Sequence, residues 1–216
     1  MKHATIVVVI LLLAAVMQPG IAQTVYQLPF ASSDNSIQLT VANTSTVPLS
    51  GVTIEATGLP GWLRFKETRQ SLGLLKGKQE IPVLFTFSVD KAAPVQKSHT
   101  LKFVVSAPTG EKWTKEITVA VAAPEKFQLF QNYPNPFNPA TMISYQLPTD
   151  SRVSLKIFNL LGQEVATLVD GQRLAGHHEE RWDARGFASG MYVHQLSLSD
   201  EKGDRQIARK AMVLLK

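Results

Sequence analysis

Apolar residues recur at every second position through much of the N-terminal half. The stretches run over residues 37–41, 52–56, 83–89, 101–105 and 117–121. Successive side chains of a strand point to opposite faces, so each stretch presents one apolar face to a core. Turn-forming residues lie between the stretches, at 43–48, 58–61, 73–77 and 108–110. Because no helical period competes, the pattern predicts an antiparallel β-sandwich of immunoglobulin type over residues 23–121.

The same alternation returns after a short linker at 122–126, which contains Pro124 and two charged residues. Strands are expected over residues 143–147, 153–157, 165–169, 192–198 and 207–215. Leu161-Gly162-Gln163 has the composition of a tight turn, and residues 200–204, with Gly203 inside, that of a hairpin. The fold class is therefore all-β, with a second small immunoglobulin-like sandwich over residues 127–216.

The first residues have the organisation of a signal peptide covering residues 1–22. Lys2 precedes an apolar run from Ile6 to Val16, and Gly20 and Ala22 are small residues placed for cleavage before Gln23. This run is shorter than the roughly 20 residues that span a bilayer, although a single-pass anchor is the alternative. No later run is long enough, so we expect no stable transmembrane helix after cleavage.

Composition narrows the classes of function. The chain contains no cysteine, which excludes disulfides, thiolate metal sites and thiol nucleophiles. Its formal net charge of +5 is divided almost evenly between the two halves, without a run of basic residues. Nucleic-acid sites concentrate their charge, so we expect no nucleic-acid partner.

Candidate catalytic and metal-binding chemistry is sparse. The cluster from His177 to Glu180 offers at most two ligands on one face of a strand, whereas a zinc site needs three or four. No serine lies in a G-x-S-x-G elbow. Asp200, Glu201 and Asp204 fall in the expected hairpin tip without the spacing of a calcium loop. We therefore expect no catalytic residues, no metal and no cofactor, and a non-enzymatic protein; an enzyme is the less favoured alternative.

The segment before the first strand of the second half is unusually stiff. It contains, in order, Asn132, Tyr133, Pro134, Asn135, Pro136, Phe137, Asn138 and Pro139. Each proline fixes φ, removes a backbone donor and restricts the preceding residue to extended conformations. This prolyl lead-in cannot be a helix or a central strand, and we expect Phe137 to close one end of the core.

With these residues in view, residues 127–216 resemble a type A C-terminal sorting domain of the type IX secretion system. This family occurs on proteins exported across the outer membrane of Bacteroidetes-like bacteria and has an immunoglobulin-like fold related to the flagellar hook-capping protein. The resemblance is carried by the prolyl lead-in and by later motifs in family order. Those motifs contain Gly162, Gly176, Trp182, Gly190, Tyr192, Lys210 and Lys216.

The resemblance implies partners and a location. The translocon of the system and its sortase-like peptidase would be the partners, and the product would be secreted or held at the outer cell surface, in some cases joined to polysaccharide. Cleavage is expected between Ala120 and Phe127. Trp182, Tyr192 and the glycines suit a role in folding, whereas the lead-in and the terminal strand with Lys210 and Lys216 are candidates for direct recognition.

Residues 30–122 are more weakly similar to immunoglobulin-like accessory modules of the NEW3 type. The similarity is carried by residues 37–44, 51–54 and 59–63. Such modules often accompany carbohydrate-active or surface domains. The alternative function is therefore a carbohydrate-binding or adhesion module, with Trp62 as the candidate ligand-binding residue and core packing as the other reading of that side chain.

Overall fold

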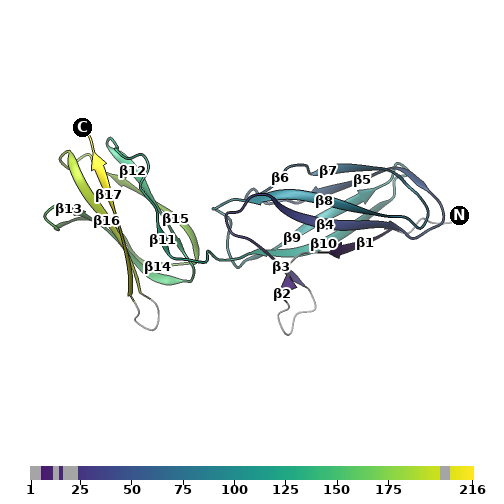
Figure 1. Ribbon diagram of the computed structural model, residues 1–216, viewed down its shortest axis with the longest axis horizontal. Helices are drawn as coiled ribbons and strands as arrows, with labels where there is room; N and C mark the ends of the chain where they lie inside the picture. The colour runs from purple at the N-terminus through teal and green to yellow at the C-terminus, as the bar shows by residue number, and fades with distance from the viewer. Residues whose placement is uncertain (1–5, 12–14, 17–23, 200–204) are drawn as a thin grey trace. The chain divides into compact units, whose positions relative to one another are not determined.

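The computed structural model describes residues 6–11, 15–16, 24–199 and 205–216. The chain divides into an N-terminal unit, Met1–Ala122, and a C-terminal unit, Ala123–Lys216 (Figure 1). Every regular element in the described residues is a strand, which confirms the all-β fold class. Among these residues no helix long and apolar enough to cross a bilayer is found.

The N-terminal unit consists of two facing sheets. The first has the order β1 (Ile6–Leu11), β4 (Asn35–Asn43), β8 (Glu80–Val89) and β6 (Leu63–Phe65). The second has the order β2 (Ala15–Val16), β3 (Val25–Leu28), β10 (Lys112–Val121), β9 (Ser98–Ser106), β5 (Leu49–Thr57) and β7 (Arg69–Leu75). Its neighbouring strands pair antiparallel, except that β3 runs parallel to β10.

Alternate residues of these strands form the core of the N-terminal unit. Ile37, Leu39 and Val41 on β4 are fully buried, as are Phe85 on β8 and Phe103 on β9. The rings of Phe85 and Phe103 lie 5.2 Å apart. Burial of such side chains supplies the main favourable term in folding. Because the chain has no cysteine, no disulfide adds to the stability that this core provides.

One expected turn was placed wrongly. Gly73 lies inside β7 rather than in a turn, and the chain reverses after Leu75. Gly73 has φ of +61° and pairs with Val52, where the register between β5 and β7 shifts. Its left-handed conformation therefore makes a bulge within the strand, a local effect that the sequence does not distinguish from a turn.

Two strands belong to the predicted signal peptide. β1 pairs antiparallel with β4, from Ile6 opposite Asn43 to Leu11 opposite Gln38, and β2 pairs with β3. Residues 1–5, 12–14 and 17–22 of the same segment lie outside the described residues.

The C-terminal unit also consists of two sheets. One has the order β11 (Gln128–Leu129), β12 (Ala140–Leu147) and β15 (Gly176–Asp183). The other has the order β14 (Glu164–Arg173), β13 (Ser151–Asn159), β16 (Gly190–Ser199) and β17 (Arg205–Leu214). All pairs are antiparallel. The hairpin predicted at 200–204 lies outside the described residues, between strands that pair as expected.

The core of the C-terminal unit contains polar atoms as well as apolar ones. Tyr145 and His194 are both fully buried. Nε2 of His194 lies 3.3 Å from the backbone oxygen of Phe130. Burial lowers the pKa of His194 to about 4 and raises the pKa of Tyr145 to about 12, so both side chains are neutral at pH 7.

Candidate functional site

The prolyl lead-in is held from within by Asn132, which is almost fully buried. Its Nδ2 donates to the backbone oxygen of Pro134 at 3.0 Å and to Oγ1 of Thr141 at 2.9 Å. Oγ1 of Thr141 in turn donates to the same Pro134 oxygen at 2.8 Å. Removing one partner of such a buried set leaves unsatisfied groups, which cost about 1–3 kcal/mol each. Asn132 therefore fixes the shape of this segment.

The lead-in also lies along the end of the terminal strand β17. The backbone of Phe137 donates to the oxygen of Val213 at 3.0 Å and accepts from the N–H of Leu215 at 2.9 Å. The side-chain oxygen of Asn135 accepts from the N–H of Val213 at 2.9 Å. The peptide bonds preceding Pro134, Pro136 and Pro139 are cis. The two segments proposed for recognition, 70 or more residues apart in the sequence, thus form one structure.

An aromatic cluster closes the core beneath this structure. Phe137 is only 2% exposed, as expected for a residue that closes the core. The ring of Trp182 lies 5.5 Å from that of Phe137 and 5.3 Å from that of Tyr192. Tyr192 turns its hydroxyl to the backbone oxygen of Ala188 at 2.8 Å. Rings packed in this way stabilise the core, so Trp182 and Tyr192 support the surface without being part of it.

Gly162 shapes an exposed hairpin between β13 and β14. It has φ of +76°, and its N–H donates to the backbone oxygen of Asn159 at 3.0 Å. Oδ1 of Asn159 accepts from the N–H groups of Leu161 and Gln163, both at 3.0 Å. The left-handed φ favours glycine at this position. Gly176 and Gly190 also have positive φ, but they stand at the beginnings of β15 and β16 rather than in a hairpin.

This turn carries apolar residues where polar ones are usual. Leu160 and Leu161 are 70% and 82% exposed. Neighbouring apolar side chains come from β13 and β16, where Phe158 pairs with Val193 and Met191 is also exposed. A hollow of about 350 Å³ lies between Phe158, Leu160, Val193 and Arg209. We call Phe158, Leu160, Leu161, Met191 and Val193 the hairpin patch; the Leu-Leu pair beside a turn glycine is its signal in the sequence.

The other residues predicted for recognition are exposed on the surface of the C-terminal unit. Tyr133 is 81% exposed, and Lys210 and Lys216 are exposed as well. Lys216 donates from Nζ to the backbone oxygen of Arg185 at 2.9 Å, and its N–H donates to Oγ of Ser189. The side chain of Arg185 hydrogen-bonds Asp183 and holds the pKa of that carboxyl below its usual range. The end of the chain is therefore attached to the loop before β16.

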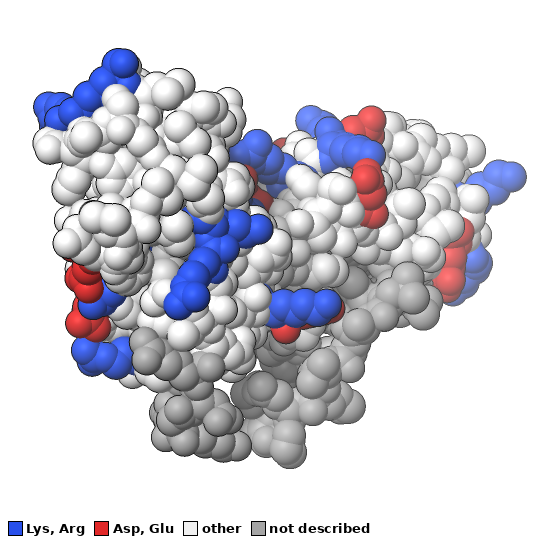
Figure 2. Space-filling view, turned by 60° about the vertical axis from the view of Figure 1, so that its left-hand side comes forward, with Lys and Arg blue, Asp and Glu red and all other residues white. Residues whose placement is uncertain are grey.

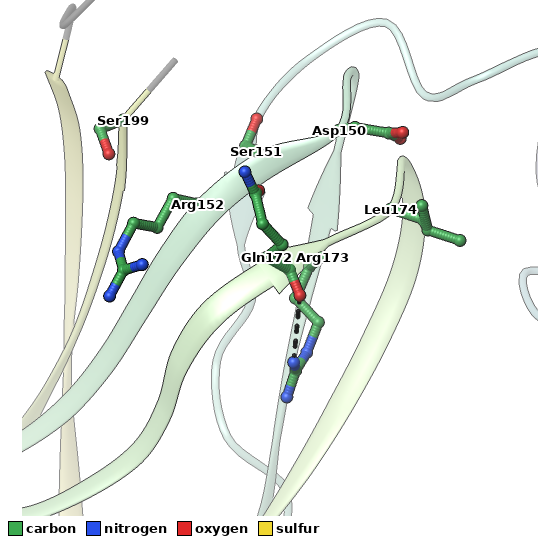
Figure 3. Close-up of a pocket in the computed structure, with 7 residues that line it drawn as sticks. All are labelled: Asp150, Ser151, Arg152, Gln172, Arg173, Leu174 and Ser199. Carbon is green, nitrogen blue, oxygen red and sulfur yellow. Dashed lines mark hydrogen bonds between the residues drawn. The ribbon is translucent and has the colours of Figure 1, made fainter. Parts of the chain in front are cut away.

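A second hollow, of about 540 Å³, opens between the ends of β13, β14 and β16 (Figure 3). Its charged groups are already engaged. Arg152 pairs with Asp170 at 3.0 Å, Arg173 pairs with Glu180 at 3.4 Å, and Oδ1 of Asp150 accepts from the N–H of Ala175. With its ions paired in this way, the hollow has the character of ordinary sheet-end surface.

The histidine cluster does not converge on a metal-binding geometry. His177 lies 3.2 Å from Oε1 of Glu179, whereas Nε2 of His178 contacts the backbone oxygen of Leu174 and its ring stacks on Tyr145. No group of three or more histidine, aspartate or glutamate side chains able to hold a metal is found within the described part of the chain.

Trp62, the candidate ligand-binding residue of the N-terminal unit, is half-buried. It packs against the core and meets the ring of His99 edge-on, with centroids 4.9 Å apart. This arrangement leaves only part of the indole available to a ligand.

On the face shown in Figure 2, basic groups are separate and acidic groups lie among them, so no continuous basic surface is present there.

Comparison with known proteins identifies the class. The family model of the secretion system C-terminal sorting domain matches residues 131–212. The C-terminal unit therefore contains a type IX sorting domain, which confirms the resemblance drawn from the sequence. The chain is a protein exported by type IX secretion, and it is secreted or attached at the cell surface.

The remaining comparisons do not bear on the function of the chain. No curated protein matches the chain. It resembles dimeric latent PorU from Porphyromonas gingivalis at 12% identity and a TM-score of 0.36, covering 96% of this chain but only 20% of that one. It also resembles the YadV chaperone at 9% identity and a TM-score of 0.32, covering 96% of this chain and 99% of the chaperone. Likenesses this weak carry no conclusion about function.

Proposed function

We propose that this is a non-enzymatic exported protein whose N-terminal unit is the cargo and whose C-terminal unit is the address. The signal peptide directs the chain through the inner membrane, and the type IX translocon then recognises the folded C-terminal unit. The observation that carries the proposal is the sorting-domain match over residues 131–212. The separate core of that unit supports it, because an address must keep its shape whatever cargo precedes it.

We assign direct contact with the translocon to the hairpin patch as well as to the prolyl lead-in and the terminal strand expected from the sequence. An exposed group of large apolar side chains is costly in solution, and such groups commonly mark protein interaction sites. Leu160 and Leu161 contribute little to the core, since most of each side chain is exposed. Their exposure therefore favours a role in binding over a role in folding.

The linker between the units is the proposed site at which a sortase-like peptidase removes the address. Glu125 and Lys126 are exposed and lie outside any strand. Exposed backbone without strand pairing is what a peptidase needs in order to draw a segment into its active site. Within the expected range between Ala120 and Phe127, cleavage after Ala122 would release the N-terminal unit with its core complete, because β10 and the buried Val121 stay with that unit. The released unit would be free or joined to surface polysaccharide.

Deleting Phe127–Lys216 tests the address. The truncated chain is expected to accumulate in the periplasm, whereas the full chain reaches the medium or the outer surface. Quantitative immunodetection in the separated fractions measures the difference. Surface delivery of the truncated chain at the level of the full chain would overturn the proposal.

The double substitution Leu160→Asn and Leu161→Asn tests the recognition surface without touching the core. Export is expected to fall about tenfold or more, as when a central apolar contact of an interface is lost. Leu174→Asn is the matched control, because Leu174 is 63% exposed in the connection between β14 and β15 of the same unit. Equal export of the two variants would remove the hairpin patch from the account.

A further inference from the structure

The edge of β4 differs from the other sheet edges of the described chain. In the structure β1, from the predicted signal peptide, covers this edge over six residue pairs. Removal of residues 1–22 leaves β4 at the margin of its sheet, next to β8 alone. Unpaired N–H and C=O groups along a strand form a template for another strand.

β4 lacks the features by which sheet edges usually avoid such pairing. It is nine residues long, contains neither a charged residue nor proline, and pairs with β8 from Asn35 to Ala42 without a shift in register. A long, regular, uncharged edge is the kind that accepts a further strand.

Removal of residues 1–22 also uncovers β3, which pairs with β2 over two residue pairs, but β3 has only four residues. The other edge strands in the described ranges are protected. β6 has three residues, one of them Arg64, and β11 has two. β7 and β14 contain register shifts together with charged residues. β15 and β17 carry charged side chains along their length, among them Glu179, Arg181, Arg209 and Lys210. Among the described strands, the long unprotected edge is therefore the one that β1 of the predicted signal peptide covers.

We propose that the exported protein pairs through β4 with β4 of a second copy, forming an antiparallel two-fold dimer. The proposal rests on removal of the signal peptide in the proposed function. In a register centred on Leu39, Ile37 faces Val41 of the second copy and Gln38 faces Thr40. Inward apolar positions then continue one core face, and polar positions meet polar ones on the other.

Self-pairing suits this sequence because every opposed pair is neutral. A charged residue near the centre of a symmetric strand pair would lie close to its own like-charged copy, which is destabilising. Antiparallel pairing is also the direction in which β1 lies on this edge. A closed two-fold contact uses the β4 edge in both copies and leaves neither β4 edge free for further growth.

The test uses protein recovered after export, with an intact-mass measurement, and the same chain prepared to begin at Gln23. Sedimentation over a range of concentrations is expected to give twice the mass of one chain. Gln38→Lys with Thr40→Lys places like charges opposite each other and should raise the dissociation constant about tenfold or more. Gln38→Glu with Thr40→Glu should do the same, and an equal mixture of the two variants should restore the dimer.

Ser71→Lys with Leu74→Lys, at exposed positions of β7, is the control and should leave the dimer intact. A monomer at every concentration overturns the proposal, as does a dimer that persists in both charged variants. A monomer that instead captures a synthetic peptide of residues 5–12 assigns the edge to a foreign strand and also overturns it. A mass that retains residues 1–22 contradicts the processing step alone, because the chain beginning at Gln23 still reports on the edge.

Discussion

At the scale of single residues, the buried ionisable groups give the C-terminal unit a dependence on pH. His194 is fully buried, and burial lowers its pKa from 6.5 to about 4. The unfolded chain takes up the proton at the higher of these two values and the folded chain at the lower. The contribution of His194 to the stability of the folded unit is therefore fully present above pH 6.5 and is lost as the pH falls towards 4.

We predict that His194→Gln flattens this pH dependence. At roughly 1.4 kcal/mol per pH unit, the free energy of unfolding of the unsubstituted chain should fall by about 3 kcal/mol between pH 6.5 and pH 4. Urea unfolding at pH 6.5 and at pH 4, monitored by hydrogen exchange in peptides from β13 and β16, measures this loss. His178→Gln is the control for replacing a histidine of the same unit, because His178 is only partly buried. An equal slope in the His194 variant would contradict this assignment.

The sequence is most informative for residues whose role is decided by burial. Ile143 and Leu147 alternate with polar neighbours, and both are fully buried in β12. Phe137 was expected in the core for its size and its prolyl neighbours, and it is there. By contrast, the partners of Asn132 could not be predicted, because the hydrogen bonds depend on a backbone path that period-two patterning does not describe.

At the scale of elements, the prolyl lead-in holds the end of β17. We predict that Asn135→Ala, which removes the acceptor for the N–H of Val213, speeds hydrogen exchange at that amide and lowers stability by about 1 kcal/mol. Asn138→Ala is the matched control, since Asn138 is an exposed residue of the same segment. Amide exchange resolved at residues 211–215 measures the effect, and unchanged protection in the Asn135 variant would contradict it.

The hairpin patch shows what patterning misses. Leu160 and Leu161 are large apolar residues of the kind usually found in a core, yet both are exposed in the turn formed by Asn159 and Gly162. The bulge at Gly73 is similar, because a glycine in a left-handed conformation can end a strand or distort it. In both cases the local structure depends on how the strands pair in the folded protein. The alternation of apolar and polar residues in a single sequence does not give this pairing.

At the scale of the whole molecule, the proposed cargo and the proposed address are two compact units, each with its own core. We predict that processing leaves the N-terminal unit intact. Replacing Glu125 and Lys126 by proline should reduce cleavage, because proline removes backbone donors that a peptidase engages. Intact mass of the exported protein measures the site, and a cut inside β12 or any later strand would contradict a linker site.

The most direct test of the address transfers it to a foreign protein. Residues 127–216 are fused to a reporter behind a signal peptide and expressed in a host with a functional type IX system and in an isogenic host that lacks the translocon. The account predicts that the reporter reaches the medium or the outer surface only in the first host and stays periplasmic in the second. Periplasmic retention in both hosts, or equal export in both, would contradict the claim that this unit is an address read by type IX secretion.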